Sequence, residues 1–169
     1  MSETDKEEID RRHRARTAKH KAVVDKRIAA AQEDKGLLLV LTGNGKGKPS
    51  SAFGMVARTL GYGHKAAVFQ FIKGKEEVGE RAYFARDPNM RWERCGEGFT
   101  WETQNREQDQ QAFDQVWPKA EAMLKDPALK TVMLDEITYM LAYELLDFAT
   151  LETALRNRPA EQNVILTGR

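Results

Sequence analysis

Residues 37–50 read Leu-Leu-Leu-Val-Leu-Thr-Gly-Asn-Gly-Lys-Gly-Lys-Pro-Ser. The five apolar residues have the length of a buried strand, and a helical pattern begins at Ser50. Glycines between a strand and a helix let backbone N–H groups turn inward, and the helix N-terminus adds the positive end of its dipole. The stretch therefore predicts an α/β fold with a phosphate-binding loop after its first strand.

This loop departs from the common phosphate-loop pattern at two positions. Thr42 stands where the first glycine is usual, and Pro49 stands where a Ser or Thr usually holds Mg²⁺. Lys48 is the best candidate for the charge partner of a phosphate, Lys46 is the second, and Ser50 is a candidate metal ligand. The candidate nucleotide-binding residues are Thr42, Gly43, Asn44, Gly45, Lys46, Gly47, Lys48, Pro49 and Ser50. The alternative is a tight strand-to-helix turn with solvated lysines.

Strands and helices alternate along the rest of the chain from residue 36. Further strands are expected at 66–72, 90–95, 131–134 and 163–167, and helices at 50–60, 80–84, 105–125, 139–146 and 150–156. Strands separated by helices require a parallel sheet with helices on both faces. Residues 36–169 are thus expected to form a three-layer sandwich like that of phosphate-loop NTPases.

Residues 1–35 form a separate charged block. Acidic residues come first and basic residues follow, an order that stabilises a helix through its macrodipole. Its apolar stripe is thin and consists of Val23, Val24, Ile28 and Ala31. Two interpretations stay open: a solvated helix, or a helical arm that docks on a partner subunit or closes over a site.

Two further segments carry candidate site residues. Val132-Met133-Leu134 is an apolar strand that ends in Asp135 and Glu136, which places two carboxylates at the same sheet edge as the loop. Either acid is a candidate Mg²⁺ ligand, directly or through water, and the alternative is that Asp135 caps the next helix. Residues 96–105 place Phe99 and Trp101 in a glycine-containing loop, where they either pack in a small core or stack on a ligand.

Composition excludes several classes of protein. The chain has 169 residues, with 27 Lys and Arg against 26 Asp and Glu, so its charge indicates neither nucleic-acid nor membrane binding. Cys95 is the single cysteine, which excludes an internal disulfide and indicates an inert thiol in a reducing compartment. The three histidines show no metal-ligand spacing. With no secretory signal expected, the cytoplasm is the predicted location.

The motifs together resemble one family, the bacterial ATP:corrinoid adenosyltransferases. The matching segments cover nearly the whole chain: Thr42-Gly-Asn-Gly-Lys-Gly-Lys48, Ala52-Phe-Gly54, Gln70-Phe-Ile-Lys-Gly74, Gly98-Phe-Thr-Trp101, Thr103-Gln-Asn-Arg106, Leu134-Asp-Glu136, Thr138-Tyr-Met140 and Thr167-Gly-Arg169. The segments around Trp101 and Gln104 are far more specific than any phosphate loop, and the missing first glycine is normal for the family.

The resemblance implies a reaction and its participants. Co(I) of a reduced corrinoid, such as cobalamin or cobyrinic acid a,c-diamide, attacks the 5′ carbon of ATP and expels triphosphate. Lys48, Mg²⁺ (or Mn²⁺) and the loop amides would neutralise the triphosphate, and no general base is needed. Phe99 and Trp101 would cover the lower face of the corrin ring and displace its axial ligand. The arm would cover the corrinoid site in a homodimer, and a reduced flavoprotein would supply electrons.

Two departures from the family pattern keep a second function open. The family has Thr at the positions of Pro49 and Ser50, and its members continue past the Thr-Gly-Arg block with more helix and strand. Pro49 removes one amide donor and one hydroxyl, and an open edge of the sheet is expected. The alternative is therefore a corrinoid- or nucleotide-binding protein with impaired turnover. An ordinary ATPase or kinase is a third candidate, which the aromatic loop argues against.

Overall fold

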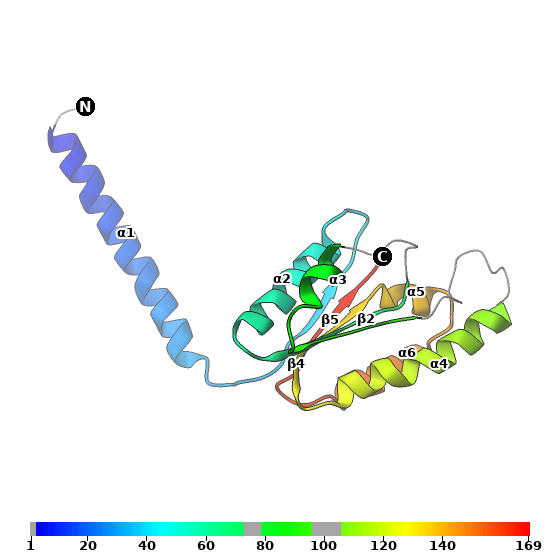
Figure 1. Cartoon of the computed structure of the whole chain (residues 1–169). Helices are drawn as coiled ribbons and strands as arrows, with labels where there is room; N and C mark the ends of the chain where they lie inside the picture. Colours follow the sequence, from blue (N-terminus) through cyan, green and yellow to red (C-terminus); the bar gives the residue numbers. More distant parts are fainter. Residues whose placement is uncertain (1–2, 73–78, 96–105) are drawn as a thin grey trace. The chain divides into compact units, whose positions relative to one another are not determined.

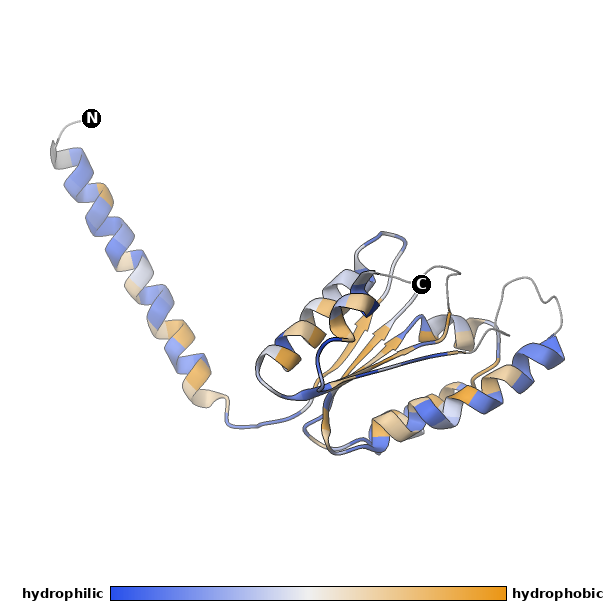
Figure 2. Cartoon of the chain, viewed as in Figure 1, coloured by the Kyte–Doolittle hydropathy of each residue, from blue (hydrophilic) through white to orange (hydrophobic). Residues whose placement is uncertain are grey.

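The computed structural model describes residues 3–72, 79–95 and 106–169, and it divides into two compact units, Met1–Asp34 and Lys35–Arg169 (Figure 1). The first unit contains one helix, α1 (Glu3–Ala30), which is mostly hydrophilic in the view of Figure 2, with a few hydrophobic residues. Its large apolar side chains Ile9, Val23, Val24 and Ile28 are exposed. A helix that is polar all round has no apolar face to bury, so packing within its own unit does not stabilise it. No helix in the described ranges is long and apolar enough to cross a bilayer.

The second unit contains a five-stranded sheet in which every neighbouring pair is parallel. Its order is β1-β5-β4-β2-β3. The strands are β1 (Leu38–Leu41), β2 (Lys65–Gln70), β3 (Met90–Arg94), β4 (Leu129–Asp135) and β5 (Asn163–Thr167). The chain order is thus interrupted between β1 and β4, where β5 is inserted, and the loop after β1 lies at the carboxyl edge with the ends of β4 and β5. This confirms the predicted parallel α/β fold.

Helices cover both faces of this sheet (Figure 1). On one face, α2 (Lys48–Gly61) and α3 (Gly79–Phe84) bury Phe53, Val56 and Phe84 against Val68 and Met133. On the other face, α4 (Arg106–Lys125), α5 (Ile137–Ala142) and α6 (Phe148–Arg156) pack on the alternate residues of the same strands. Because successive strand residues point to opposite faces, the central strands are apolar almost throughout, as Figure 2 shows.

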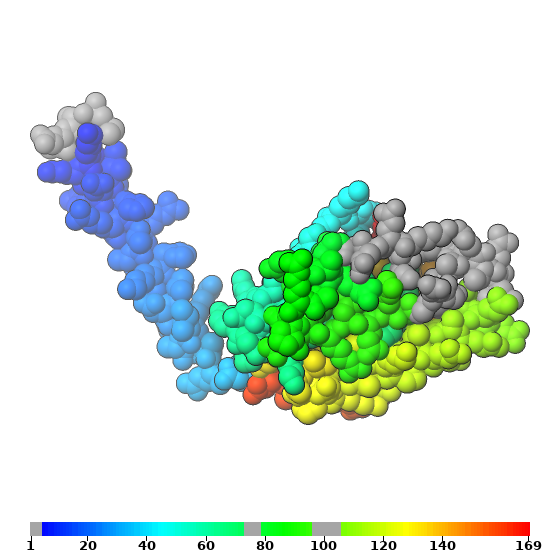
Figure 3. Space-filling model, viewed as in Figure 1, coloured from blue at the N-terminus to red at the C-terminus, as the bar shows by residue number. Residues whose placement is uncertain are grey.

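The two edges of the sheet differ in character. Edge strand β1 leaves Leu38 and Val40 exposed on one face, whereas Leu39 and Leu41 pack under α2. Edge strand β3 carries charge, with an ion pair between Arg91 and Glu93, and its region lies on the near surface in Figure 3. Charge on an edge discourages pairing with another chain. Of the two edge strands, β1 is therefore the apolar one.

Several element boundaries differ from expectation. The helix expected at 139–146 begins earlier and ends at Ala142, because Glu144 adopts a positive φ of 55° and reverses the chain. Strand β4 is three residues longer than expected because it is hydrogen-bonded on both sides, by β2 and β5. Helix α2 begins at Lys48, two residues early, with Pro49 in its first turn, where proline is tolerated.

Cys95 is buried against the β2 end, and its backbone N–H donates to the carbonyl oxygen of Gln70 at 3.0 Å. Burial raises the pKa of the Cys95 thiol from 9.0 to about 12, and the charge of Lys119 opposes the rise. Such a thiol is protonated at neutral pH and is a poor nucleophile. The inert cysteine predicted from the sequence agrees with this environment.

The raised pKa of Cys95 predicts a loss of stability in alkali. Above about pH 9 the thiol ionises in the unfolded chain but stays protonated in the folded one until about pH 12. The free energy of unfolding should therefore fall with rising pH in this window, by at most about 1.4 kcal/mol per pH unit from this group. Urea unfolding of the wild type and Cys95→Ala at pH 8 and 10.5 measures this. An equal pH dependence in both proteins would contradict the prediction.

Candidate functional site

The glycine-rich loop joins β1 to α2 at the carboxyl edge of the sheet. Gly43 and Gly47 have positive φ angles of 124° and 102°, a conformation that favours glycine, and Gly47 is the N-cap of α2. Among the described residues, no backbone N–H of residues 43–47 donates to a protein acceptor. These donors, at a helix N-terminus, form a site suited to an anion.

Lys48 closes the loop on itself. Its Nζ donates to the carbonyl oxygens of Gly43 at 2.6 Å and Gly45 at 2.8 Å. The ammonium is therefore held inside the curve of the loop rather than extended into solvent. A phosphate bound there would replace two neutral acceptors with charged ones, which make stronger hydrogen bonds. Lys46, by contrast, is exposed and makes no such bond to a described residue.

A pocket of about 390 Å³ lies beside the loop. It is lined by Val40, Leu41, Thr42, Lys46, Gly47, Lys48 and Ser51. Thr42, Lys46, Gly47 and Lys48 were predicted binding residues, but Ser51 was not. Ser50 is exposed in the first turn of α2, and Pro49 beside it has no N–H to offer.

Asp135 ends β4 and is buried, with both carboxylate oxygens used inside the protein. Its Oδ1 accepts from Thr167 Oγ1 at 2.6 Å, and its Oδ2 accepts from Gln70 Nε2 at 3.0 Å. The N-cap of α5 is Glu136, and it makes no side-chain capping bond. The alternative that Asp135 caps the following helix is therefore wrong.

Glu136 is half-buried and lies in the left-handed region, with φ 59° and ψ 26°. Its Oε2 is buried and has no hydrogen-bond partner among the described residues. Burial and the Asp135 carboxylate raise the pKa of Glu136, and the positive charges of Lys48 and Arg169 oppose this rise. Lys48, in the glycine-rich loop, thus acts electrostatically on the Glu136 carboxylate. The loop and the acid therefore belong to the same candidate site.

The chain after β5 packs closely against the acidic segment. Gly168 has a φ of 148°, and a Cβ at this position would lie 1.7 Å from Thr138 Oγ1. Its N–H donates to the carbonyl oxygen of Leu41 at 3.3 Å, at the end of β1. The glycine therefore allows the last strand to meet both α5 and the start of the phosphate loop, and it brings Arg169 to the site.

A magnesium ion fits this donor set. Mg²⁺ uses one or two carboxylates together with phosphate oxygens and water, so it needs no dedicated cage. The described ranges contain no group of three or more His, Cys, Asp or Glu side chains able to hold a metal. Glu136 Oε2 is a buried oxygen without a hydrogen-bond partner among the described residues, whereas each oxygen of Asp135 already accepts one hydrogen bond. Phe99 and Trp101 lie outside the described residues.

Some residues at this edge had no role in the sequence-based prediction. The side chains of Gln70 and Thr167 donate hydrogen bonds to Asp135, and Trp92 donates one to Gln70. Arg169 acts on Glu136 through its charge. Gln70 and Thr167 end their strands beside Asp135, and polar residues at the ends of apolar strands are the signal that identifies them.

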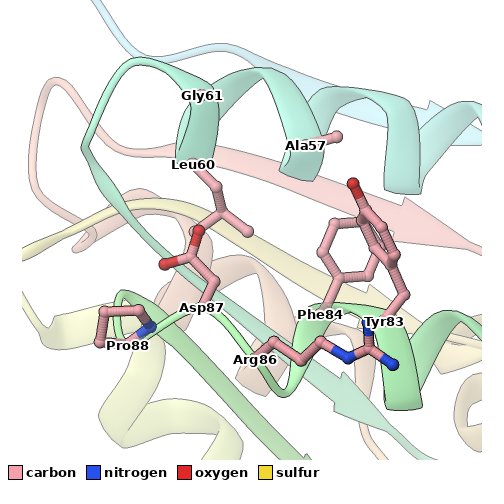
Figure 4. A pocket seen from close by; sticks show the side chains of 8 residues that line it. All are labelled: Ala57, Leu60, Gly61, Tyr83, Phe84, Arg86, Asp87 and Pro88. Atoms are coloured by element: carbon pink, nitrogen blue, oxygen red, sulfur yellow. The ribbon is translucent and has the colours of Figure 1, made fainter.

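A second pocket, of about 480 Å³, lies at the opposite end of α2 (Figure 4). Figure 4 shows Ala57, Leu60 and Gly61 of α2 on one side of this pocket, and on the other side five residues from α3 and the turn after it: Tyr83, Phe84, Arg86, Asp87 and Pro88. Its residues precede β3 or lie in the C-terminal half of α2. It therefore lies near the amino ends of the strands, whereas parallel sheets place their ligands at the carboxyl ends.

Comparisons with known proteins identify the family of this chain. The model of the family "ATP:corrinoid adenosyltransferase BtuR/CobO/CobP" matches residues 34–169. A corrinoid adenosyltransferase of Pseudomonas aeruginosa is 48% identical over 163 residues, which are 96% of this chain and 80% of the relative. Those of Salmonella typhimurium and Escherichia coli K12 are 48% and 46% identical over 95% of this chain and 81% of each relative. The chain therefore belongs to the ATP:corrinoid adenosyltransferase family.

Proposed function

We propose that the protein transfers the 5′-deoxyadenosyl group of ATP to Co(I) of a corrinoid and releases triphosphate, in cobalamin synthesis or salvage. The cobalt electron pair forms the Co–C bond, and the C5′–O bond breaks with its electron pair leaving on triphosphate. The observation that carries the proposal is the loop of unpaired amides around Lys48, beside Glu136, in a chain of this family. The family and its named relatives do not favour a protein limited to binding.

The protein's contribution is alignment and charge neutralisation. The nucleophile carries no proton, so no side chain needs to act as a general base. The loop amides of residues 43–47 and the Lys48 ammonium would bind the triphosphate and stabilise the charge that develops on it as it leaves. These donors are already oriented by the loop, and preorganised donors stabilise developing charge without reorganisation.

Mg²⁺, or Mn²⁺, would supply further neutralisation of the triphosphate when bound. Glu136 is proposed as its carboxylate ligand because Oε2 is buried and unpaired, and Ser50 as a hydroxyl ligand from the first turn of α2. Asp135, with both oxygens hydrogen-bonded within the protein, would act through water or through Glu136.

Phe99 and Trp101 are proposed to cover the lower face of the corrin ring and displace its axial ligand. This proposal depends on the resemblance of the Gly98-Phe-Thr-Trp101 segment to the family. The charged α1 is proposed as the arm of a homodimer that covers the corrinoid site, and a reduced flavoprotein as the electron donor. The cytoplasm is the proposed location.

An anaerobic assay tests the proposed function. The protein is incubated with ATP, Mg²⁺ and chemically reduced cobalamin, and both the absorbance change of Co–C bond formation and the released phosphate species are measured. Adenosylated corrinoid and triphosphate in equal amounts are expected. Inorganic phosphate without Co–C bond formation would indicate an ATPase or kinase, and tight ATP binding without product would indicate the binding protein.

Pro49→Thr is expected to tighten ATP binding. The substitution returns one amide donor and one hydroxyl to the first turn of α2, and each bond to a charged phosphate is worth about 1.5–3 kcal/mol. The expected gain in affinity is about ten- to a hundredfold. Calorimetric titration with a non-hydrolysable ATP analogue measures it. Pro88→Thr, in the distant pocket, is the control, and an unchanged affinity in Pro49→Thr would show that the lost donors do not matter.

A further inference from the structure

A chain of side-chain hydrogen bonds crosses four adjacent strands of the sheet. Trp92 Nε1 donates to Gln70 Oε1 at 3.1 Å, and Gln70 Nε2 donates to Asp135 Oδ2 at 3.0 Å. Thr167 Oγ1 donates to Asp135 Oδ1 at 2.6 Å and accepts from the backbone N–H of Glu136 at 3.0 Å. The members come from β3, β2, β4 and β5, which are neighbours in that order. This series of hydrogen bonds ends at the backbone N–H of Glu136.

The direction of every bond in this chain is determined by chemistry. The indole N–H of Trp92 can only donate and an ionised Asp135 can only accept, so the amide of Gln70 has one orientation that satisfies both. A threonine hydroxyl has one proton, and Asp135 takes it, which leaves the lone pairs of Thr167 Oγ1 for the Glu136 N–H. The network is thus a rigid support. Its last acceptor, Thr167 Oγ1, binds the backbone N–H of the Glu136 peptide.

That peptide needs support because Glu136 is a non-glycine residue in the left-handed region, with φ 59°. This conformation is unfavourable for residues with a Cβ and persists where the surroundings impose it. It occurs at the junction of β4 and α5, where the chain turns between Asp135 and the helix. The hydrogen bond that the Glu136 N–H donates to Thr167 Oγ1 holds the backbone that carries the Glu136 carboxylate, whose Oε2 has no partner among the described residues.

We infer that Thr167 is a positioning residue for the metal-bound triphosphate: its hydroxyl, anchored by Asp135, holds Glu136 in the conformation that presents its carboxylate to the phosphate loop. Gln70 and Trp92 extend this support by holding the other oxygen of Asp135. The inference rests on the proposed function, in which Glu136 is the metal ligand. It assigns Asp135 to the support rather than to direct ligation.

The test measures Mn²⁺ binding by electron paramagnetic resonance in the presence of ATP and without corrinoid. Thr167→Val keeps the side-chain shape and removes the hydroxyl, and it should weaken Mn²⁺ binding by about 10–100-fold, as loss of outer support for a metal ligand does. ATP binding in EDTA should stay unchanged, because the loop is untouched. Thr167→Ser keeps the hydroxyl and should retain most of the Mn²⁺ affinity.

A matched control exists in the same sheet. Thr131 at the start of β4 is equally buried, and its hydroxyl lies 2.7 Å from that of Thr59. Thr131→Val removes a buried threonine hydroxyl near the amino end of β4, at the opposite edge of the sheet from Glu136. It should therefore lower stability without changing Mn²⁺ affinity. Wild-type Mn²⁺ affinity in Thr167→Val, or an equal loss in Thr131→Val, would overturn the inference.

Two further variants keep the test decisive if Thr167→Val does not fold. Gln70→Leu removes one hydrogen bond to Asp135, so its loss of Mn²⁺ affinity should be smaller than that of Thr167→Val. Trp92→Phe removes only the indole N–H that donates to Gln70, so its loss should be smaller still. Unchanged affinity in Gln70→Leu would overturn the inference. A wild type that binds Mn²⁺ and ATP but makes no Co–C bond would refute the proposed function and leave the role of Thr167 intact.

Discussion

Lys48→Ala is expected to weaken ATP binding by about ten- to a hundredfold, since a hydrogen bond to a charged group contributes about 1.5–3 kcal/mol. Turnover should fall further, by about a hundred- to a thousandfold, as it does when one preorganised donor to developing charge is removed. The structure supports this because Lys48 Nζ already lies inside the loop, bonded to the carbonyl oxygens of Gly43 and Gly45. Single-turnover adenosylation with preformed Co(I) measures the chemical step apart from binding.

Two other lysines make the result interpretable. Lys46→Ala removes an exposed lysine of the same loop and should reduce ATP affinity by less. Lys65→Ala removes an exposed lysine at the amino end of β2, far from the carboxyl edge, and should have no effect. Loss of activity in Lys48→Ala no greater than in Lys46→Ala would mean that Lys48 is not the principal charge partner.

Glu136→Gln is expected to have the second large effect, a loss of turnover on the order of a thousandfold, because a metal contributes several kcal/mol of charge stabilisation in such reactions. The amide keeps the size of the side chain and removes the charge that binds the ion. Excess Mg²⁺ should recover part of the activity, whereas excess ATP should not. The measurement is the rate of Co–C bond formation as a function of Mg²⁺ at saturating ATP.

The control for this substitution is Glu161→Gln. Glu161 is an exposed carboxylate near the amino ends of the strands, where it pairs with Lys130 at 2.8 Å. Its removal should change neither activity nor the requirement for Mg²⁺. A Glu136→Gln protein with the Mg²⁺ dependence of the wild type would mean that the metal binds elsewhere, and the position of the ligand would have to be reassigned.

Local patterns were sufficient to predict the architecture. The apolar runs around Val40, Val68 and Met133 identify strands because consecutive apolar residues suit a sheet covered on both faces, although the edge strand β1 leaves Val40 exposed. The helices between them impose parallel pairing, since the chain must cross back before the next strand starts. The ends of the helix expected at 139–146 were not predictable, because the turn at Glu144 is supported by contacts of Leu145 and Leu146 with the carbonyl oxygen of Met140.

The candidate site was predicted in part. The glycine loop and the pair Asp135 and Glu136 follow the ends of strands, and parallel strands bring such ends to one edge whatever their order. The strand order itself was not predictable, because the insertion of β5 between β1 and β4 depends on packing across the whole sheet. That order places Thr167 beside Asp135 and brings Arg169 to Glu136.

The sequence by itself determined that a phosphate loop with Lys48 and two adjacent carboxylates would share one edge of a parallel sheet, because each of these features is encoded within a few consecutive residues. Only the tertiary structure decided which carboxylate is available. Gln70, 65 residues before Asp135, and Thr167, 32 residues after it, each donate to one oxygen of Asp135, whereas Glu136 Oε2 has no partner in the part of the chain that the structure describes. Hydrogen bonds between such distant residues exist only after the strands have paired.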